Sequence, residues 1–166
     1  MYSCMMGGGS LELVISNGVA FAHAGDTVVI VYAAPARLHR TQWLFDRLEE
    51  RVARAAPLNA LMVLLPASEV PDADTRAENT RRMANVRGQL RSVVTVVVGD
   101  SMRISLVRTI MRAIFLVQGL SKVQQIVCSV SEGLALLLSD PTPRMPSRSQ
   151  LDASLREIAR QLDCSL

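Results

Sequence analysis

Three carboxylates stand close together in residues 66–74, which read Pro-Ala-Ser-Glu-Val-Pro-Asp-Ala-Asp: Glu69, Asp72 and Asp74. Carboxylates at this spacing could bind a divalent metal ion, or act as a general acid and a general base. The alternative is structural, because acidic side chains at the start of a helix are stabilised by the positive end of its dipole. A helix is expected directly after this segment, so we favour the structural role and expect neither a metal site nor a catalytic residue here.

A second candidate site lies where Gly99-Asp100-Ser101 follows an apolar run and precedes a helix-length segment. The backbone N–H groups at such a helix start can hold a phosphate or a sulfate. Arg103 and Arg108 are near enough in sequence to assist. The alternative is that Ser101 caps the helix by itself. We therefore note a possible anion site at Ser101 and Arg103.

Few other residues have types and spacings that carry chemistry. His23 and His39 have no flanking nucleophile pattern such as Gly-x-Ser-x-Gly, so both are expected to be structural. No Gly-x-Gly-x-x-Gly follows an expected strand, which disfavours a dinucleotide site. Cys4, Cys128 and Cys164 include no Cys-x-x-Cys pair, so neither a disulfide framework nor a zinc site is indicated, and Cys128 is expected in the core. We expect no cofactor and no enzymatic activity.

The composition is that of a globular domain, with 49% hydrophobic and 20% charged residues in 166. The net charge of +3 is the balance of 18 basic and 15 acidic residues. Lys122 is the single lysine. Aromatic residues make up 4% of the chain, too few for a nucleic-acid stacking platform, so no nucleic-acid partner is expected. Because no signal-peptide pattern is present and Arg108 and Arg112 interrupt the most apolar helix, we expect a cytoplasmic chain without a transmembrane segment.

Two short apolar runs, residues 61–65 and 93–98, are each followed by a helix-length segment. Runs of this kind indicate strands buried on both faces, joined by right-handed crossovers in a parallel sheet. We expect an α/β fold with a mixed, mostly parallel sheet of four to six strands and an N-terminal β-hairpin. The expected strands are 11–16, 19–24, 27–33, 60–65, 93–98 and 125–130, and the expected helices are 38–55, 75–90, 102–120, 133–138 and 151–162.

Four regions follow from this pattern. Residues 1–10 contain Gly-Gly-Gly-Ser and have no periodicity, so they are expected to be a flexible leader. Residues 11–139 form the α/β domain, residues 140–150 a linker rich in proline and serine, and residues 151–166 an amphipathic helix. A helix that short is not stable alone and must dock on its own domain or on a partner.

The turns from Ile114 to Leu120 are apolar around nearly the whole circumference of the expected helix. A helix that packs on a sheet needs only one apolar stripe. The apolar residues on the other side of this helix must therefore be covered by another segment or molecule. The C-terminal helix of the same chain, a second copy of the chain and a lipid-like ligand are the three alternatives. We expect the chain to self-associate as a homodimer, through Ile114, Phe115, Val117, Leu155, Ile158 and Leu162.

The order of these elements resembles the STAS fold, the family of anti-sigma factor antagonists and of sulfate-transporter cytoplasmic domains. The resemblance covers about residues 19–139 and includes Val93-Val-Thr-Val-Val-Val98 before Gly99-Asp100-Ser101, and the segment Cys128-Ser-Val-Ser-Glu-Gly-Leu-Ala-Leu-Leu137. Antagonists of this family carry Asp-Ser-Ser/Thr-Gly at a helix start, where a kinase phosphorylates a hydroxyl. Here the matching segment, 71–77, retains Asp74-Thr75 but neither the second hydroxyl nor the glycine.

The resemblance implies a non-enzymatic regulatory module that docks to a protein partner. It makes Thr75 a possible phospho-acceptor; the structural alternative is a residue of the first helical turn. The partner-binding surface is expected on the basic helix that follows: Thr75, Arg76, Arg81, Arg82 and Arg87. Reversing the charges of Arg81 and Arg82 would then abolish partner binding and leave the melting temperature unchanged. A carrier of a lipid or other apolar ligand is the alternative, and a small flavodoxin-like enzyme is a further one.

Overall fold

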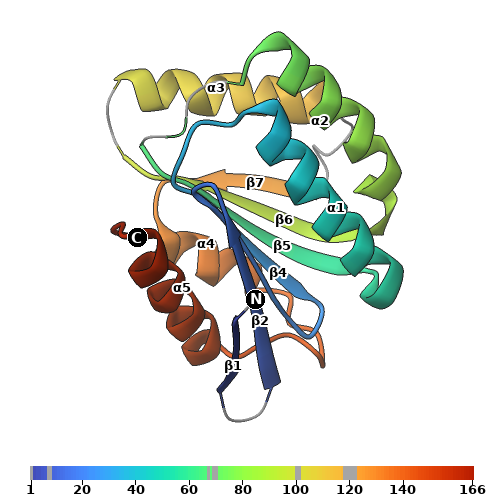
Figure 1. The fold of residues 1–166 in the computed structure, drawn as a ribbon, viewed down its shortest axis with the longest axis vertical. Helices are drawn as coiled ribbons and strands as arrows, with labels where there is room; N and C mark the ends of the chain where they lie inside the picture. The colour runs from blue at the N-terminus through green and yellow to red at the C-terminus, as the bar shows by residue number, and fades with distance from the viewer. Residues whose placement is uncertain (1, 7–8, 67, 69–70, 100–101, 118–122) are drawn as a thin grey trace.

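Helices cover both faces of one central sheet (Figure 1). The computed structural model describes residues 2–6, 9–66, 68, 71–99, 102–117 and 123–166. The sheet lies between a layer of three helices and a layer of two. The α/β class and the mixed sheet with an antiparallel N-terminal part, both expected from the sequence, are confirmed.

The seven strands of the sheet lie in space in the same order as in the chain. They are β1 (Tyr2–Met6), β2 (Gly9–Ser16), β3 (Val19–Ala24), β4 (Thr27–Tyr32), β5 (Leu58–Leu64), β6 (Leu90–Val97) and β7 (Gln124–Val127). Strands β1 to β4 pair antiparallel, and β4 to β7 pair parallel. The turn at Asn17-Gly18 uses positive φ values of 50° and 77°, as the Asn-Gly signal indicates.

One strand lies outside the expected set, because β1 falls within the segment 1–10 that was expected to be a flexible leader. It pairs antiparallel with β2, from Tyr2 opposite Leu13 to Met6 opposite Gly9. Backbone pairing of this kind needs no hydrophobic periodicity, so the sequence pattern gave no sign of it. Within the described residues, the sheet therefore has one strand more than the largest expected number, six.

Helices α1 (Leu38–Ala55), α2 (Ala73–Val86) and α3 (Met102–Val117) lie on one face of the sheet (Figure 1). The chain steps from β4 to β7 always in the same direction, and right-handed crossovers then place every connecting helix on the same face. Helix α1 buries one stripe against the sheet, at Thr41, Leu44, Phe45, Leu48 and Val52. A short 3₁₀ turn, Arg87–Gln89, leads from α2 into β6.

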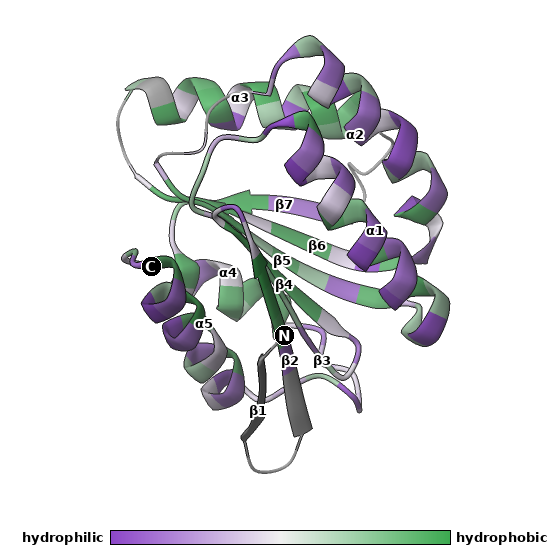
Figure 2. Cartoon of the chain, viewed as in Figure 1, coloured by the Kyte–Doolittle hydropathy of each residue, from purple (hydrophilic) through white to green (hydrophobic). Residues whose placement is uncertain are grey.

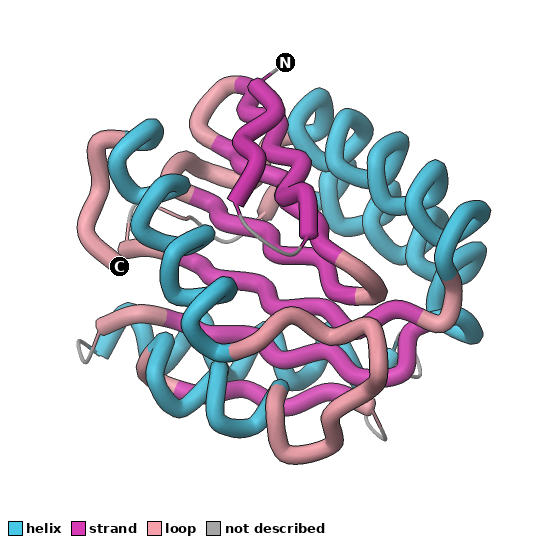
Figure 3. Tube along the Cα trace, turned by 90° about the horizontal axis from the view of Figure 1, so that it is seen from below, coloured by secondary structure: helices cyan, strands magenta, loops and turns pink. Residues whose placement is uncertain are grey.

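The opposite face is covered by α4 (Val130–Leu137) and α5 (Arg148–Leu162), and Figure 3 views the molecule from this side. Helix α4 approaches the sheet closely, because a Cβ atom at Gly133 would lie 2.5 Å from Cγ2 of Val96. Helix α5 begins with a capping box between Ser147 and Gln150 and packs on β3. The C-terminal helix therefore docks within its own chain, but on the face opposite α3, so it is not the cover that the sequence analysis considered for the apolar turns of that helix.

The segment before α5 is held against the sheet. Arg91 forms an ion pair with Asp140 at 2.7 Å, and the hydroxyl of Thr142 donates to Asp26. The backbone of Arg144 passes directly over Gly25, a position where a Cβ atom would collide with the Arg144 carbonyl. This part of the expected linker, 140–150, thus joins α4 to α5 as a loop packed on the sheet, and α5 begins three residues earlier than expected.

Candidate functional site

An apolar cavity of about 110 Å³ lies between the sheet and helices α1, α2 and α3. Its lining is mostly aliphatic and comes from both layers: Ile30, Ala60, Met62, Leu64, Leu90 and Val93 from the strands, and Leu44, Phe45, Leu48, Met83, Val107, Ile110, Met111, Ile114 and Phe115 from the helices. Ala60 presents a methyl group where the neighbouring strands present larger side chains, which leaves space above β5.

Helix α3 borders the cavity because it touches the sheet at only some of its inward positions. Ile104, Val107 and Phe115 are buried, whereas Ile110, Met111 and Ile114 are half-buried although they line the cavity. In a close-packed interior such apolar side chains would be covered by partners. Met111 and Ile114 pack against the core in part, and together with Ile110 they line the cavity.

The polar side chains of the lining gather at one end of the cavity. Tyr32 ends β4, Ser68 follows β5, Thr41 lies early in α1, and Thr75, Arg76 and Asn79 lie early in α2. This end is the carboxyl edge of the parallel strands, where open α/β sheets generally bind ligands. The cavity therefore has a long apolar part and one polar end.

Most of the buried hydroxyl groups at the polar end have partners. The Ser68 hydroxyl donates to the backbone carbonyl of Tyr32 at 3.0 Å, which holds the segment after β5 against β4. Burial raises the pKa of Tyr32 far above its usual value, and the nearby Thr41 hydroxyl offsets only a part of that effect. Tyr32 therefore stays protonated and neutral.

Thr75 differs from its neighbours. Its side chain is 1% exposed and lines the cavity, and its Oγ1 has no hydrogen-bond partner within the described part of the chain. The hydroxyl is close enough to Asp72 to help lower the pKa of that carboxyl, but the contact lacks the distance and angle of a hydrogen bond. The Pro71 carbonyl, four residues earlier, accepts instead from Arg76 at 2.7 Å.

Two carboxylates of segment 66–74, Asp72 and Asp74, lie at the start of α2. Asp72 is the N-cap of α2 and accepts from the Thr75 backbone N–H at 2.8 Å, while Asp74 is exposed in the first turn. The nearby Thr75 hydroxyl and the hydrogen bond from the Thr75 backbone N–H lower the pKa of Asp72, so it stays ionised as a cap. These two residues thus act as an acidic helix start, and Glu69 lies outside the described residues.

The possible anion site cannot be placed in the same way, because Ser101 and the Arg103 side chain lie outside the described residues. Arg108 is described: its Nη2 donates to the backbone carbonyl of Val97 at 2.9 Å and to that of Gly99. These bonds tie the middle of α3 to the end of β6, at the edge of the sheet beside the cavity. Arg108 therefore holds α3 in position.

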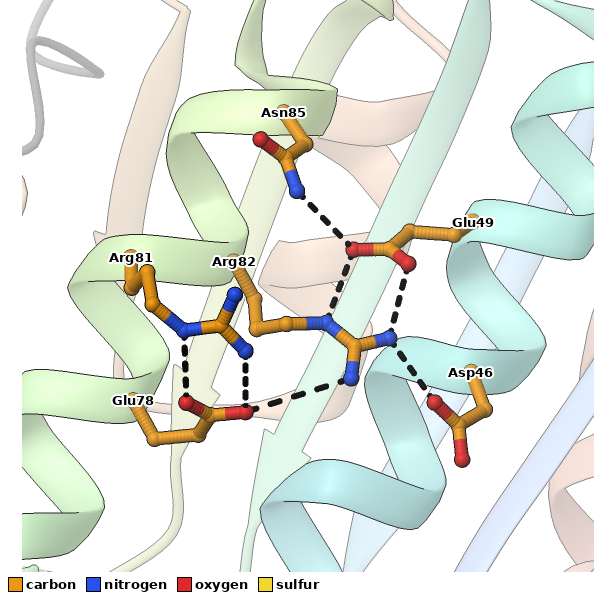
Figure 4. A network of polar contacts seen from close by, with 6 residues as sticks. All are labelled: Asp46, Glu49, Glu78, Arg81, Arg82 and Asn85. Carbon is orange, nitrogen blue, oxygen red and sulfur yellow. Dashed lines mark hydrogen bonds and ion pairs between the residues drawn. The ribbon is translucent and has the colours of Figure 1, made fainter.

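The expected partner-binding arginines of α2 are engaged within the chain (Figure 4). Arg82 donates to Glu49 at 2.7 and 2.8 Å and to Asp46 at 2.8 Å, and its side chain is 12% exposed. Its guanidinium also lies 5.7 Å from the ring centroid of Phe45. Hydrogen bonding to Glu49 raises the pKa of Arg82, and the residue joins α2 to α1.

The other members of that surface are spread along α2 and the 3₁₀ turn after it. Arg81 pairs with Glu78 through two hydrogen bonds of 2.8 and 2.9 Å, and Arg76 donates to the Pro71 carbonyl. Arg87 is exposed in the 3₁₀ turn. Thr75 is buried, so a kinase could not reach its hydroxyl in this conformation. The five residues thus do not form one common exposed surface.

The six residues expected to mediate self-association are also mostly used within the chain. Phe115, Leu155 and Ile158 are buried, and Ile114 and Leu162 pack partly buried against the core. Val117 is exposed, together with Met102, Leu106 and Leu116 of the same helix, at 77%, 90%, 58% and 68%. The exposed apolar side chains therefore lie on the outer side of α3. The ribbon of this helix in Figure 2 alternates green segments with purple ones.

His23 is expected to make the stability of the fold depend on pH. Its Nε2 lies 3.0 Å from Oε2 of Glu12, yet burial, reinforced by Arg51, lowers the pKa of His23 below 6.5. The unfolded chain then binds the proton more readily, so stability is retained above pH 6.5 and falls as the pH drops below it. We expect the urea midpoint to fall between pH 7.5 and pH 5.5, and to fall less in His23→Gln. An equal fall in both proteins would contradict this assignment.

The remaining candidates lie away from the cavity lining. His39 is exposed near the start of α1. Cys128 is exposed, which corrects the expectation of a core residue, because β7 ends at Val127 and the next residues turn into α4. Cys164 is partly buried beyond α5, and burial raises the pKa of its thiol. The side chain of Cys4 lies outside the described residues.

The sequence did not reveal the cavity, although the excess of apolar residues in α3 was a signal of it. No protein-family model matches the chain, and no curated protein matches its sequence. Within the described residues, no three His, Cys, Asp or Glu side chains are grouped so that they could hold a metal ion. None of the described helices has the length and hydropathy needed to cross a membrane.

Proposed function

We propose that this chain is a non-enzymatic binding module of STAS-like type, and that its ligand is a small apolar molecule held in the cavity beneath α3. The cavity carries this proposal, since it is apolar along most of its length and polar at one end. The run of elements from the β3–β4 hairpin through three crossovers to β7 and α4 supports the STAS-like part. The proposal keeps the expectation of a cytoplasmic regulatory module.

The size of the cavity suits a compact ligand. An engineered apolar cavity of roughly 150 Å³ in another protein stays dry and binds benzene. At about 110 Å³ this cavity is smaller, so a ligand of similar size fits when the incompletely buried side of α3 shifts outward. A long-chain lipid would require a larger displacement of α3.

Filling the cavity tests the proposal. In Ile110→Trp the larger side chain extends from α3 into the space that the ligand would occupy, so we expect the affinity for p-xylene to fall tenfold or more. Binding is measured by titration of the isoleucine methyl signals in NMR spectra, and native mass spectrometry of the purified chain reports any retained ligand. Met111→Phe provides a second, smaller filling substitution.

Leu106→Trp is the matched control, because Leu106 lies on the exposed side of the same helix. It adds the same indole ring without entering the cavity, and its affinity for p-xylene should equal that of the unmodified chain. The absence of p-xylene binding, or binding that is equal in Ile110→Trp and the unmodified chain, would contradict the proposed function.

Docking to a protein partner is the second candidate function, and the exposed outer side of α3 favours it over the basic face of α2. Met102, Leu106, Leu116 and Val117 form an apolar surface that the described part of the chain leaves uncovered. The two functions separate in the paired variants, because Ile110→Trp alters the cavity and Leu106→Trp alters the outer surface.

A further inference from the structure

We infer that the ligand of this cavity carries a hydrogen-bonding oxygen, a hydroxyl in the simplest case, at the end that reaches Thr75. This inference rests on the proposed function and narrows the chemical class of the ligand. The site is thus assigned to small aromatic or aliphatic alcohols and phenols and not to pure hydrocarbons.

The hydroxyl of Thr75 is the observation that carries this inference. A buried hydroxyl without a partner costs free energy, so native proteins seldom leave one unsatisfied. The Thr75 side chain is 1% exposed, and its Oγ1 lacks a hydrogen-bond partner within the described residues. Because it lines the cavity, a ligand in the cavity can supply the partner.

The neighbouring polar groups explain why we assign this role to Thr75. Ser68 donates to the carbonyl of Tyr32, whereas the Thr75 hydroxyl has no partner within the described residues. The carbonyl of Pro71, four residues before Thr75, accepts from Arg76. The rest of the lining is almost wholly aliphatic and aromatic, so a ligand with several polar groups would leave some of them without partners.

The position of Thr75 also fixes the orientation of the ligand. Thr75 is the third residue of α2, and its backbone N–H is already held by Asp72 at 2.8 Å. The first turn of α2 is thereby fixed, and the hydroxyl is presented at the polar end of the cavity. The apolar part of the ligand then lies over Ala60 and Val93, beneath Ile110 and Ile114 of α3.

The test compares p-cresol with p-xylene, which have nearly the same shape and differ by a hydroxyl in place of a methyl group. We expect the ratio of their affinities, p-cresol over p-xylene, to fall about tenfold in Thr75→Val, which keeps the shape of the side chain and removes the hydroxyl. Thr75→Ser keeps the hydroxyl and should keep the ratio of the unmodified chain. Using the ratio cancels the different hydration of the two compounds.

The stability of the ligand-free variants gives a second readout. If the hydroxyl has no partner, Thr75→Val melts at or above the temperature of the unmodified chain. A large drop in that variant would show that the hydroxyl is already bonded, and would overturn the inference. An unchanged affinity ratio in Thr75→Val, with p-xylene still bound, also overturns it and leaves the proposed function standing. Binding of neither compound contradicts the proposed function and the inference together.

Discussion

Replacing Ile158 by alanine is expected to lower the free energy of unfolding by roughly 2–5 kcal/mol. Ile158 has no exposed surface, and it packs with Leu151 and Leu155 of α5 into the core on the face of the sheet that α4 and α5 cover. Truncation removes apolar contacts and leaves a void that a close-packed interior fills only in part. Urea denaturation of the full chain measures the effect, and Ile158→Asp is expected not to fold.

Arg156→Ala is the control, because Arg156 lies two residues earlier in α5 and is exposed. Its free energy of unfolding should stay within about 0.5 kcal/mol of the unmodified chain. A seam between subunits, as the sequence also allowed, would give a different result. Ile158→Ala would then change the number of subunits in native mass spectra while the folded monomer kept its stability, and that outcome would contradict the docking of α5 within its own chain.

Much of the fold was accessible from the sequence because buried strands and amphipathic helices leave strong local patterns. The run Val93-Val-Thr-Val-Val-Val98 predicts a strand, and residues 93–97 belong to β6, buried on both faces. The spacing of Leu44, Leu48 and Val52 predicts α1, whose bounds agree with the expectation. Repeated crossovers in one direction then determine the helix layer, since their handedness is nearly invariant.

The misplaced elements depend on pairing and not on periodicity. Strand β1 is defined by its antiparallel bonds to β2, and no hydrophobic alternation marks it. Cys128 lies one residue past the end of β7, where an apolar sequence continues although the strand does not. Single sequences locate the ends of elements poorly, because the residues that end them act through distant partners.

The cavity, too, could not be predicted from the sequence alone. Its lining includes Ala60 of β5 with Ile110 and Met111 of α3, residues far apart in the sequence that the crossovers bring to one cavity. The sequence identified Thr75 by its resemblance to a phospho-acceptor, but it could not show that the hydroxyl faces inward. Composition did indicate the apolar excess of α3, and the structure divides that excess between the cavity and the outer surface.

Replacing Arg82 by glutamate is expected to destabilise the fold, which reverses the expectation that sequence analysis gave for this residue. Arg82 connects α2 to α1 through Glu49 and Asp46, with Glu78 at 3.9 Å from its Nη1 (Figure 4). Arg82→Ala leaves these carboxylates without their cation, at a cost of about 1–3 kcal/mol in the free energy of unfolding. Arg82→Glu adds a like charge among them, so its loss should be larger. Urea denaturation at neutral pH measures both.

Arg81→Glu is the matched control for charge, since Arg81 lies on the same helix and is largely exposed. Its loss of stability should be much smaller, because exposed ion pairs contribute little. Helices α1 and α2 form two walls of the cavity, so weakening their junction in Arg82→Ala should also weaken p-xylene binding, whereas Arg81→Ala should leave it unchanged. Equal stability of Arg82→Glu and Arg81→Glu would mean that the network is a feature of the surface, and that these arginines remain available for a partner.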